Sequence, residues 1–161
     1  GRPVMGRVLG WGSANYANHI TAPARDGCGL VAAVAKALDR AGLAAAAIAA
    51  VSAHGTGTPY NDAMELTAFQ RLFPDRRLPV NSIKGAIGHT LGAAGAIEAV
   101  LGLQALREGV LPPTVGLLDP EPAGCGQVAG TAQAFSGGCL LSTNSGFGGV
   151  NAALILGREG C

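Results

Sequence analysis

The apolar residues of this chain occur in blocks with two different spacings, separated by glycine-rich segments. In residues 28–43, CGLVAAVAKALDRAGL, apolar side chains recur at helical intervals, and Arg40 followed by Gly42 is typical of a helix end. Shorter apolar runs bounded by turn residues are typical of strands buried in a sheet. The two spacings together predict a mixed α/β fold. The predicted strands cover residues 6–17, 46–54, 78–82, 139–144 and 151–157.

Two of the strand predictions carry further detail. Residues 46–54, AAIAAVSAH, have the pattern of a buried strand, although their alanines also suit the end of a helix. The runs CLLSTN (139–144) and NAALILG (151–157) flank a short glycine-rich turn. We therefore expect these two strands to pair as antiparallel neighbours.

A second helix is predicted over residues 63–73, AMELTAFQRLF, with Asn61 or Asp62 as its cap and Pro74 closing it. The segment 111–137 is rich in proline and glycine and is predicted to be connection. The chain contains no repeat, coiled coil or low-complexity tract, and no linker long enough to divide it. One domain is therefore expected over residues 1–161.

The segment from Thr90 to Leu106 is apolar on nearly every face of a third predicted helix. A helix of this kind is either buried within protein or spans a bilayer. The run is slightly short for a bilayer and carries Glu98 near its centre, where lipid would strongly penalise a charge. We therefore expect a helix buried between two layers.

The composition narrows this picture. Aromatic residues make up only 4% of the 161 residues while glycine occurs 26 times, so the core is expected to consist of Ala, Val, Leu and Ile packed closely through glycine. A chain of this length can bury such a core. The formal net charge of +1, with no long basic run, gives no electrostatic reason to expect binding to nucleic acid or to an anionic membrane.

The cysteines and the first residues bear on the compartment. Cys28, Cys125, Cys139 and Cys161 show no C-x-x-C spacing, and we interpret them as reduced thiols. The first ten residues lack the long apolar segment of a signal peptide. A soluble, cytoplasmic protein is therefore expected.

Three glycine-rich loops carry polar side chains where predicted strands end or helices begin. They are HGTGT (54–58), KGAIGHTLGAAG (84–95) and NSGFGG (144–149). In layered α/β proteins, ligands bind at such loops. These loops are therefore the candidate site.

His54 and His89 lie in the first two loops, each framed by glycines. A lone histidine is more often a structural residue than a functional one. Two such histidines, one of them close to a helix start that favours negative charge, would be well placed to donate hydrogen bonds to one oxyanion. A metal site with Asp62 as a third ligand is disfavoured, because no tight ligand spacing is present and the neighbouring threonines are poor ligands.

Lys84 is predicted to end a strand five residues before His89. The usual lysine is solvated, but the apolar neighbours of Lys84 suggest partial burial. A buried lysine needs a carboxylate, and Glu98 in the apolar helix is the natural partner. Segment 84–95 lacks both the G-K-[ST] ending of a P-loop and the Rossmann spacing, so nucleotide binding is weakly supported.

Three segments in this order resemble the C-terminal half of a β-ketoacyl-acyl carrier protein synthase: AHGTGTPYND (53–62), NSIKGAIGHTLGAAG (81–95) and NSGFGGVNA (144–152). This family comprises the condensing enzymes of fatty-acid and polyketide synthesis. The segments ANHITAP and DGCGLVAAVAKALDRAGL also resemble the entry to this half, so the likeness covers about residues 5–158.

The resemblance implies a thiolase-like layered fold. Residues 1–161 would form half of an αβαβα sandwich, with a mixed sheet and a central helix buried between layers. The N-terminal half, which carries the nucleophilic cysteine of the family, would be absent from this chain. The central helix alone would then leave a large apolar face uncovered.

The resemblance also implies roles for the first two loops. The histidine of HGT and the histidine of GH, here His54 and His89, would each donate an Nε–H to the thioester carbonyl of malonyl-carrier protein. They would stabilise the enolate that forms as carbon dioxide leaves. Thr56 and Thr58 would bind the pantetheine arm by hydrogen bonds.

Further residues follow from the same likeness. Lys84 and its acidic partner Glu98 would hold the histidine loops in place. Phe147 matches the gating phenylalanine, whose backbone N–H contributes to the oxyanion hole for the acyl group. The remaining matched positions are expected to give structural support: Asp62, Glu65 and Gly148.

Two features depart from the family pattern. Ser145 stands where the family has the first phenylalanine of N-S-F-G-F-G-G, which leaves gating and acyl-chain preference open. Cys28 begins a predicted helix but matches a variable site of the family, so it is not expected to be the nucleophile. Cys139, within a strand, is expected to be a small core residue.

The leading hypothesis is a decarboxylative Claisen condensation, an acyltransferase reaction in fatty-acid or polyketide synthesis, with this chain supplying the decarboxylation site. No metal or cofactor is expected, because the substrates travel on the phosphopantetheine arm of acyl carrier protein. The expected partners are acyl carrier protein, the N-terminal half and a second copy of the complete enzyme.

Two alternatives remain. A non-catalytic partner resembling a chain-length factor would shape a pocket without condensing, but such partners tend to lose the histidines. An α/β binding module would hold some other phosphate-bearing ligand in its glycine loops.

Overall fold

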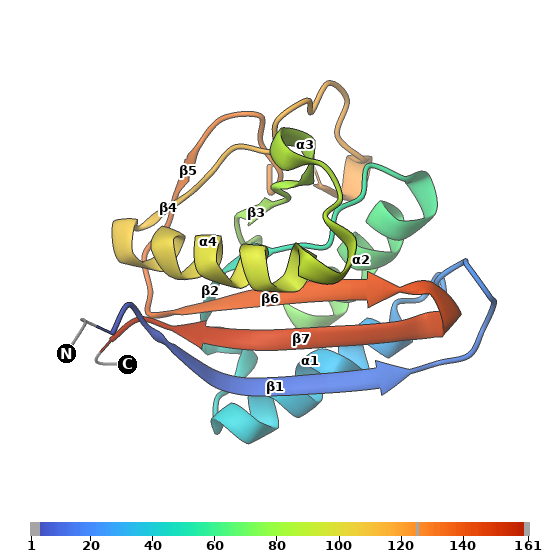
Figure 1. Cartoon of the computed structure of the whole chain (residues 1–161), viewed down its shortest axis with the longest axis horizontal. Coiled ribbons are helices and arrows are strands. Elements are labelled where there is room, and N and C mark those ends of the chain that lie inside the picture. The colour runs from blue at the N-terminus through green and yellow to red at the C-terminus, as the bar shows by residue number, and fades with distance from the viewer. Residues whose placement is uncertain (1–3, 125, 160–161) are drawn as a thin grey trace.

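A mixed sheet forms the centre of the molecule in the computed structural model, which describes residues 4–124 and 126–159. Its strand order is β1-β7-β6-β2-β3 (Figure 1). The strands are β1 (Arg7–Asn15), β2 (Ile48–Ser52), β3 (Val80–Asn81), β6 (Cys139–Gly146) and β7 (Val150–Gly157). The pairs β1–β7 and β7–β6 are antiparallel, whereas β6–β2 and β2–β3 are parallel. The mixed α/β fold predicted from the sequence is thereby confirmed.

Helices cover both faces of this sheet (Figure 1). The elements outside the sheet are α1 (Cys28–Ala41), α2 (Pro59–Leu72), α3 (Lys84–Ile87), α4 (Ala94–Glu108) and the 3₁₀ turns η1 (Ala45–Ala47), η2 (Leu91–Ala93), η3 (Pro122–Gly124) and η4 (Phe147–Gly149). Helix α1 packs on β1 and β7 and against α2, whereas α4 packs on β6 and β7 from the other side. Two short strands, β4 (Val110–Leu111) and β5 (Gln133–Ala134), pair beside α4; β5 lies within the predicted connection 111–137, and β4 begins one residue before it.

The described residues form a hydrophobic core on each face of the sheet. Successive side chains of a strand point to opposite faces. On β6, Leu141 joins the core beneath α1 and α2, while Leu140 joins the core beneath α4. Ile155 and Leu156 divide in the same way on β7. The central strands are apolar on both faces because both faces are covered.

The strand and helix predictions were right in most places. Strands β1, β2, β6 and β7 lie within or close to the predicted ranges, β6 and β7 are antiparallel neighbours, and α1 ends before Gly42. Cys139 is buried in the core, as expected. Cys125 and Cys161 lie outside the described residues.

The start of α2 differs from the prediction. The helix begins at Pro59, with Thr58 as the N-cap residue, so Asn61 and Asp62 lie inside the first turn and do not cap it. Proline suits the first helical position because its fixed φ is helical and its missing N–H would be unpaired there anyway. Thr58, with an extended backbone, provides the change of direction.

The segment around α4 also differs in detail. Strand β3 ends at Asn81, so Lys84 does not end a strand but begins the single turn α3. Helix α4 begins at Ala94 rather than near Thr90, since Leu91 has a left-handed backbone with φ of 52° that a regular helix does not accommodate.

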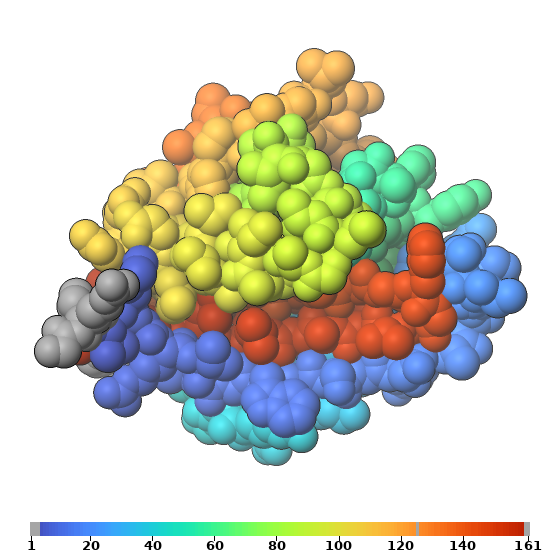
Figure 2. All heavy atoms as spheres, viewed as in Figure 1, coloured from blue at the N-terminus to red at the C-terminus, as the bar shows by residue number. Residues whose placement is uncertain are grey.

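Helix α4 is buried on one side only. Glu98, Gly102 and Ala105 are buried, whereas Val100, on another side, is 59% exposed. Figure 2 shows α4, in yellow, on the surface of the molecule above β6 and β7. The exposed side agrees with the expectation that this helix would leave an apolar face uncovered in this chain alone, whereas burial between two layers is not seen in the described part of the chain. No helix in the described ranges has the length and apolarity to cross a membrane.

Candidate active site

The loop after β2 places His54 in a buried position. His54 lies two residues beyond the end of β2 and its side chain is 6% exposed. The backbone of Gly55 has φ of 40°, and a methyl group added there would lie 2.5 Å from Cβ of Ser82. Glycine is therefore required at 55, since it alone accepts both this conformation and this close approach.

The carboxylate of Glu65 fixes the backbone of this loop by hydrogen bonds. It accepts hydrogen bonds from the backbone N–H groups of His54 (2.9 Å) and Gly55 (2.7 Å). The side chains of Asn61 and Thr143 also donate to it. Burial raises the pKa of Glu65, while these donated hydrogen bonds act to lower it. Glu65 thus fixes the backbone on which His54 sits.

His89, from the loop between α3 and η2, meets His54 at close range. The two ring centroids lie 5.2 Å apart, and the rings are nearly perpendicular, at 80°. His89 is solvent-exposed in the described structure, and its Nδ1 accepts a hydrogen bond from the backbone N–H of Leu91 (3.2 Å). Two loops that are far apart in the sequence therefore bring their imidazoles to one place.

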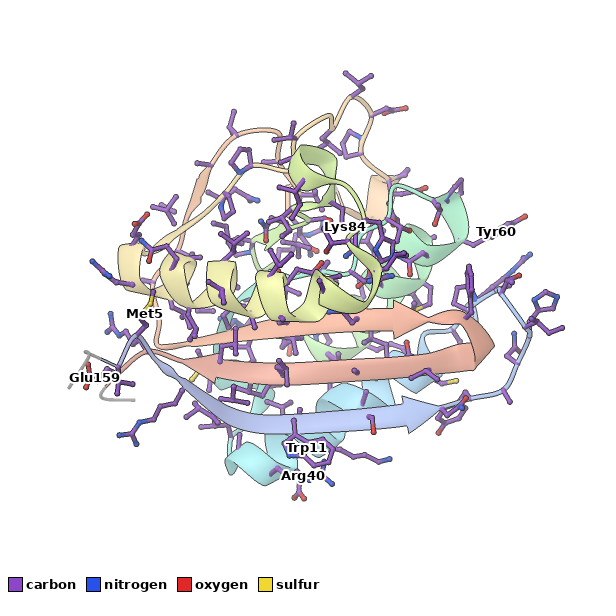
Figure 3. The ribbon with its side chains drawn as sticks, in the orientation of Figure 1. Met5, Trp11, Arg40, Tyr60, Lys84 and Glu159 are labelled. Atoms are coloured by element: carbon purple, nitrogen blue, oxygen red, sulfur yellow. The ribbon has the colours of Figure 1, made fainter. Side chains whose placement is uncertain are left out.

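Lys84 and Glu98 form a buried ion pair behind the histidines. Lys84 Nζ lies 2.5 Å from Glu98 Oε1 and also donates to the backbone carbonyl of His54 at 2.5 Å. Glu98 is 1% exposed. The side chain of Lys84, the first residue of α3, lies between α3 and the N-terminal end of α4 in the view of Figure 3. The partner that the sequence suggested for Lys84 is the one found, and the pair ties α4 to the His54 loop.

Asn144, near the end of β6, was not singled out from the sequence. Its Nδ2 donates to Glu98 Oε2 at 2.7 Å, and its Oδ1 lies 3.3 Å from His54 Nδ1. Asn144 is the first residue of the motif NSGFGG, which is the only sequence signal that points to it. It joins the ion pair to the imidazole of His54.

The surroundings of His54 disfavour a positive charge on its ring. Burial, and then the charge of Lys84, lower the pKa of His54 from 6.5 to about 4, whereas the hydrogen bond to Asn144 acts in the opposite direction. His54 is therefore neutral at neutral pH, which is the state that an imidazole needs in order to act as a donor or an acceptor through a single nitrogen.

A cleft of about 440 Å³ lies against these loops and is lined by Gly55, Thr56, Lys84 and His89, with Asp62 and Glu65 also on its wall. Thr56 and Thr58, expected to bind a pantetheine arm, point their hydroxyls at each other at 2.8 Å. Thr58 is exposed, and Asp62 accepts a hydrogen bond from Asn61.

The last glycine loop lies apart from this cleft. Phe147 is 79% exposed and is not among the residues that line the cleft. Gly148 has φ of 78°, which suits glycine in this tight turn. Ser145 donates to Oδ1 of Asn151 at 2.9 Å.

Two further candidates from the sequence, a metal site and Cys28, can be compared with the described residues. No cluster of three or more potential metal ligands occurs in residues 4–124 and 126–159. Cys28 lies at the start of α1, and burial together with the carboxylate of Asp26 raises the pKa of its thiol. A raised pKa disfavours the thiolate that a nucleophile requires.

Comparison with known proteins gives one consistent family. Residues 5–118 match the model of the family described as "Beta-ketoacyl synthase, C-terminal domain". The chain is 43% identical over 161 residues to a protein of Rhizobium meliloti (strain 1021) named 3-oxoacyl-[acyl-carrier-protein] synthase 2. That alignment covers 98% of this chain and 38% of the relative, so the chain spans about two fifths of the relative's length.

Solved structures with the same fold include ketosynthases. One, described as "The ishigamide ketosynthase/chain length factor", has a TM-score of 0.90 and 35% identity, over 98% of this chain and 39% of that one. Another is described as a type II PKS acyl-carrier protein in complex with its ketosynthase bound to the hexaketide. It has a TM-score of 0.90 and 27% identity, over 97% of this chain and 39% of that one.

Proposed function

The chain belongs to the β-ketoacyl synthase family through its C-terminal domain, and from this membership we propose that it supplies the malonyl decarboxylation site of a condensing enzyme. The observation that carries the proposal is the pair of imidazoles of His54 and His89, whose centroids lie 5.2 Å apart. The enzyme would join an acyl group to a malonyl unit in fatty-acid or polyketide synthesis.

The proposed reaction has two steps. The carbon–carbon bond to the malonyl carboxylate breaks, carbon dioxide leaves, and the electron pair forms an enolate of the thioester. The enolate carbon then attacks the acyl thioester on a cysteine of the N-terminal half, so that a carbon–carbon bond forms and the cysteine thiolate leaves. Imidazoles positioned beside the thioester oxygen favour the first step, because preorganised polar groups in a site with little water stabilise developing charge strongly.

The groups around the histidines support this assignment. The ion pair of Lys84 and Glu98 and the carboxylate of Glu65 hold the His54 loop from two directions. We propose that Thr56 and Thr58 receive the pantetheine arm, and that Phe147 closes over the acyl group once the N-terminal half is in place. In this scheme the acyl and malonyl groups are already activated as thioesters, and no metal or redox cofactor takes part.

The partners follow from the same proposal. The exposed apolar side of α4 would pack against the N-terminal half, which would supply the nucleophilic cysteine. Acyl carrier protein would deliver the malonyl unit, as it binds the ketosynthase in the related complex. The complete enzyme would be a cytoplasmic homodimer.

The proposed roles of the histidines can be tested in the complete enzyme. His54→Ala and His89→Ala are each expected to lower the rate of malonyl-carrier protein decarboxylation by about 100-fold or more, which is the size of the loss when one preorganised polar group is removed from such a site elsewhere. His19→Ala removes the third histidine, which lies in the loop between β1 and α1, and is expected to leave the rate unchanged. Decarboxylation at the normal rate in both His54→Ala and His89→Ala would refute the proposal.

A second candidate function is a partner subunit like a chain-length factor. The similar structure described as "The ishigamide ketosynthase/chain length factor" favours keeping it. Both histidines are present here, which favours the condensing role. If the variant His54→Ala/His89→Ala in a two-subunit complex condensed at the normal rate, the partner function would be preferred.

A further inference from the structure

The hydrogen-bond partners of the two imidazoles determine which ring nitrogen carries the proton in each. A neutral imidazole has one N–H and one bare nitrogen, so the partner of Nδ1 decides what Nε2 presents to a substrate. His54 and His89 have partners of opposite kinds at Nδ1. The tautomers of the two rings are therefore expected to be opposite.

For His54, the argument begins at the ion pair. Glu98 is paired with Lys84 at 2.5 Å and is therefore an ionised carboxylate, which can only accept hydrogen bonds. Asn144 must then direct its NH₂ group at Glu98, at 2.7 Å. This leaves the carbonyl oxygen of the same amide facing His54 Nδ1 at 3.3 Å. An amide oxygen only accepts, so Nδ1 of His54 carries the proton.

For His89, the partner is a backbone group. The N–H of Leu91 lies 3.2 Å from Nδ1 of His89, and an N–H only donates. Nδ1 of His89 is therefore bare, and Nε2 carries the proton. Leu91 is the non-glycine residue with a positive φ among residues 4–124 and 126–159, and this left-handed backbone accompanies the contact.

We propose that Asn144 is a positioning residue that holds His54 as the Nδ1–H tautomer, so that His54 presents a hydrogen-bond acceptor and His89 a donor to the substrate. The catalytic meaning of this assignment rests on the proposed function. It differs from the two-donor arrangement expected from the family resemblance. His89 alone donates to the thioester oxygen, while Nε2 of His54 accepts from a proton-bearing group, such as a water molecule or an amide N–H of the carrier arm.

The environment of His54 is consistent with a neutral ring. The groups that face it are Lys84, His89 and Asn144, of which Lys84 is a cation. Burial and Lys84 keep the pKa of His54 near 4, so a second proton on the ring is disfavoured at neutral pH. The bare Nε2 of His54 is thus available as an acceptor.

The tautomers can be measured directly in the intact protein labelled with ¹⁵N-histidine. Long-range ¹H–¹⁵N correlation spectra near neutral pH distinguish protonated from bare ring nitrogens. We expect a protonated Nδ1 and a bare Nε2 for His54, and the reverse for His89. The spectrum of a His54→Ala variant assigns the signals. A His54 ring protonated at Nε2, at both nitrogens, or in an equal mixture would overturn the proposal.

Two variants test the role of Asn144. Asn144→Leu, of similar size, removes the acceptor, so the His54 signals should no longer show a single Nδ1–H tautomer. The double variant Asn144→Asp/Glu98→Gln exchanges the carboxylate and the amide, and it should restore the tautomer because the carboxylate introduced at position 144 would again accept from Nδ1. Ser145→Ala, whose hydroxyl bonds Asn151 instead, serves as the control and should leave the spectrum unchanged. An unchanged His54 tautomer in Asn144→Leu would contradict the assignment.

The spectra and the activity separate the two proposals. Normal decarboxylation in both histidine-to-alanine variants would refute the proposed function while leaving the tautomers of the rings as measured. Conversely, if the histidines are essential but the rings do not have opposite tautomers, only the role of Asn144 is refuted. If both proposals hold, Asn144→Leu lowers kcat for decarboxylation by about 10-fold or more with a smaller change in KM, since acid–base groups contribute at least that much.

Discussion

At the scale of single residues, His54 is placed where a proton on its second nitrogen is costly. Burial removes the ring from water, and the charged Nζ of Lys84 lies nearby, where it donates a hydrogen bond to the backbone carbonyl of His54. Both effects destabilise an imidazolium, and together they lower the pKa from 6.5 to about 4. The same burial that makes the ring useful as a neutral group therefore makes folding sensitive to acid.

This sensitivity has a definite sign. Between about pH 4 and pH 6.5, His54 is protonated in the unfolded chain but not in the folded chain, so the unfolded state binds more protons. The stability that His54 contributes is complete above 6.5 and is expected to be lost as the pH falls towards 4. Urea denaturation at about pH 7 and about pH 5 measures the change in the free energy of unfolding.

A variant isolates the contribution of His54. His54→Leu cannot take up the proton, so its free energy of unfolding is expected to fall less between the two pH values than that of the wild type. The raised pKa of Glu65 acts in the opposite direction, but it is present in both proteins and cancels in the comparison. His19→Leu is the control and should follow the wild type. Equal falls in the wild type and in His54→Leu would contradict the prediction.

The residues of the site were predictable to different degrees from the sequence. His54, His89 and Lys84 stand in recognisable motifs, and the partner of Lys84 could be inferred because a buried cation needs a carboxylate. Asn144 was missed because its contacts depend on long-range geometry. It lies 90 residues from His54 and 46 from Glu98 in the sequence, and no local pattern indicates which way its amide faces.

At the scale of elements, the packing of β1 on α1 depends on glycine. Gly10 and Gly12 alternate with larger residues on β1 and direct their bare faces at α1. A methyl group added at Gly12 would lie 2.1 Å from the carbonyl oxygen of Ala33, and one at Gly10 would lie 2.2 Å from that of Ala37. The helix and the strand therefore approach each other more closely than any side chain allows. At the edge of the sheet, Arg40 of α1 stacks on the ring of Trp11 of β1 (Figure 3).

Gly12→Ala is expected to push α1 away from β1 and to lower the free energy of unfolding by about 1–3 kcal/mol, as overpacking does in other cores. Chemical denaturation measures the difference. Gly146→Ala, at the end of β6, is the matched control, because a methyl group there meets nothing within 4 Å and its φ of −136° suits alanine. Similar losses in the two variants would show that close packing is not the reason for glycine at 12.

The element boundaries show where local patterns lose their power. The periodicity of α1 and the apolar runs of β6 and β7 are strong local signals, and these elements were predicted well. The N-terminus of α2 was misplaced because Asn61 and Asp62 are also good capping residues. The helix instead begins at Pro59, a residue that suits the first helical position. The start of α4 depends on the left-handed backbone of Leu91, which no pattern of apolar residues encodes.

At the scale of the whole molecule, the sheet is covered unequally. Helices α1 and α2 bury one core fully, whereas α4 covers only part of the other face and leaves its own outer side open (Figures 1 and 2). Ala96 and Val100 are four residues apart and lie on this open side, together with Leu101. The sequence predicted a helix that is apolar on nearly every face, but within this chain only one side of α4 is buried.

We expect the exposed apolar side of α4 to bind another protein surface, since soluble proteins rarely expose a large apolar patch without a function. The chain produced alone should therefore self-associate, and Val100→Lys should shift it towards monomer in sedimentation velocity. Leu118→Lys is the matched control, because Leu118 is 96% exposed in the connection after β4 and should not change the association. In the proposed complete enzyme, a lysine at position 100 would be buried against the N-terminal half and would lower the free energy of unfolding, whereas a lysine at position 118 would not. A monodisperse monomer that unfolds cooperatively would mean that the open side of α4 needs no partner.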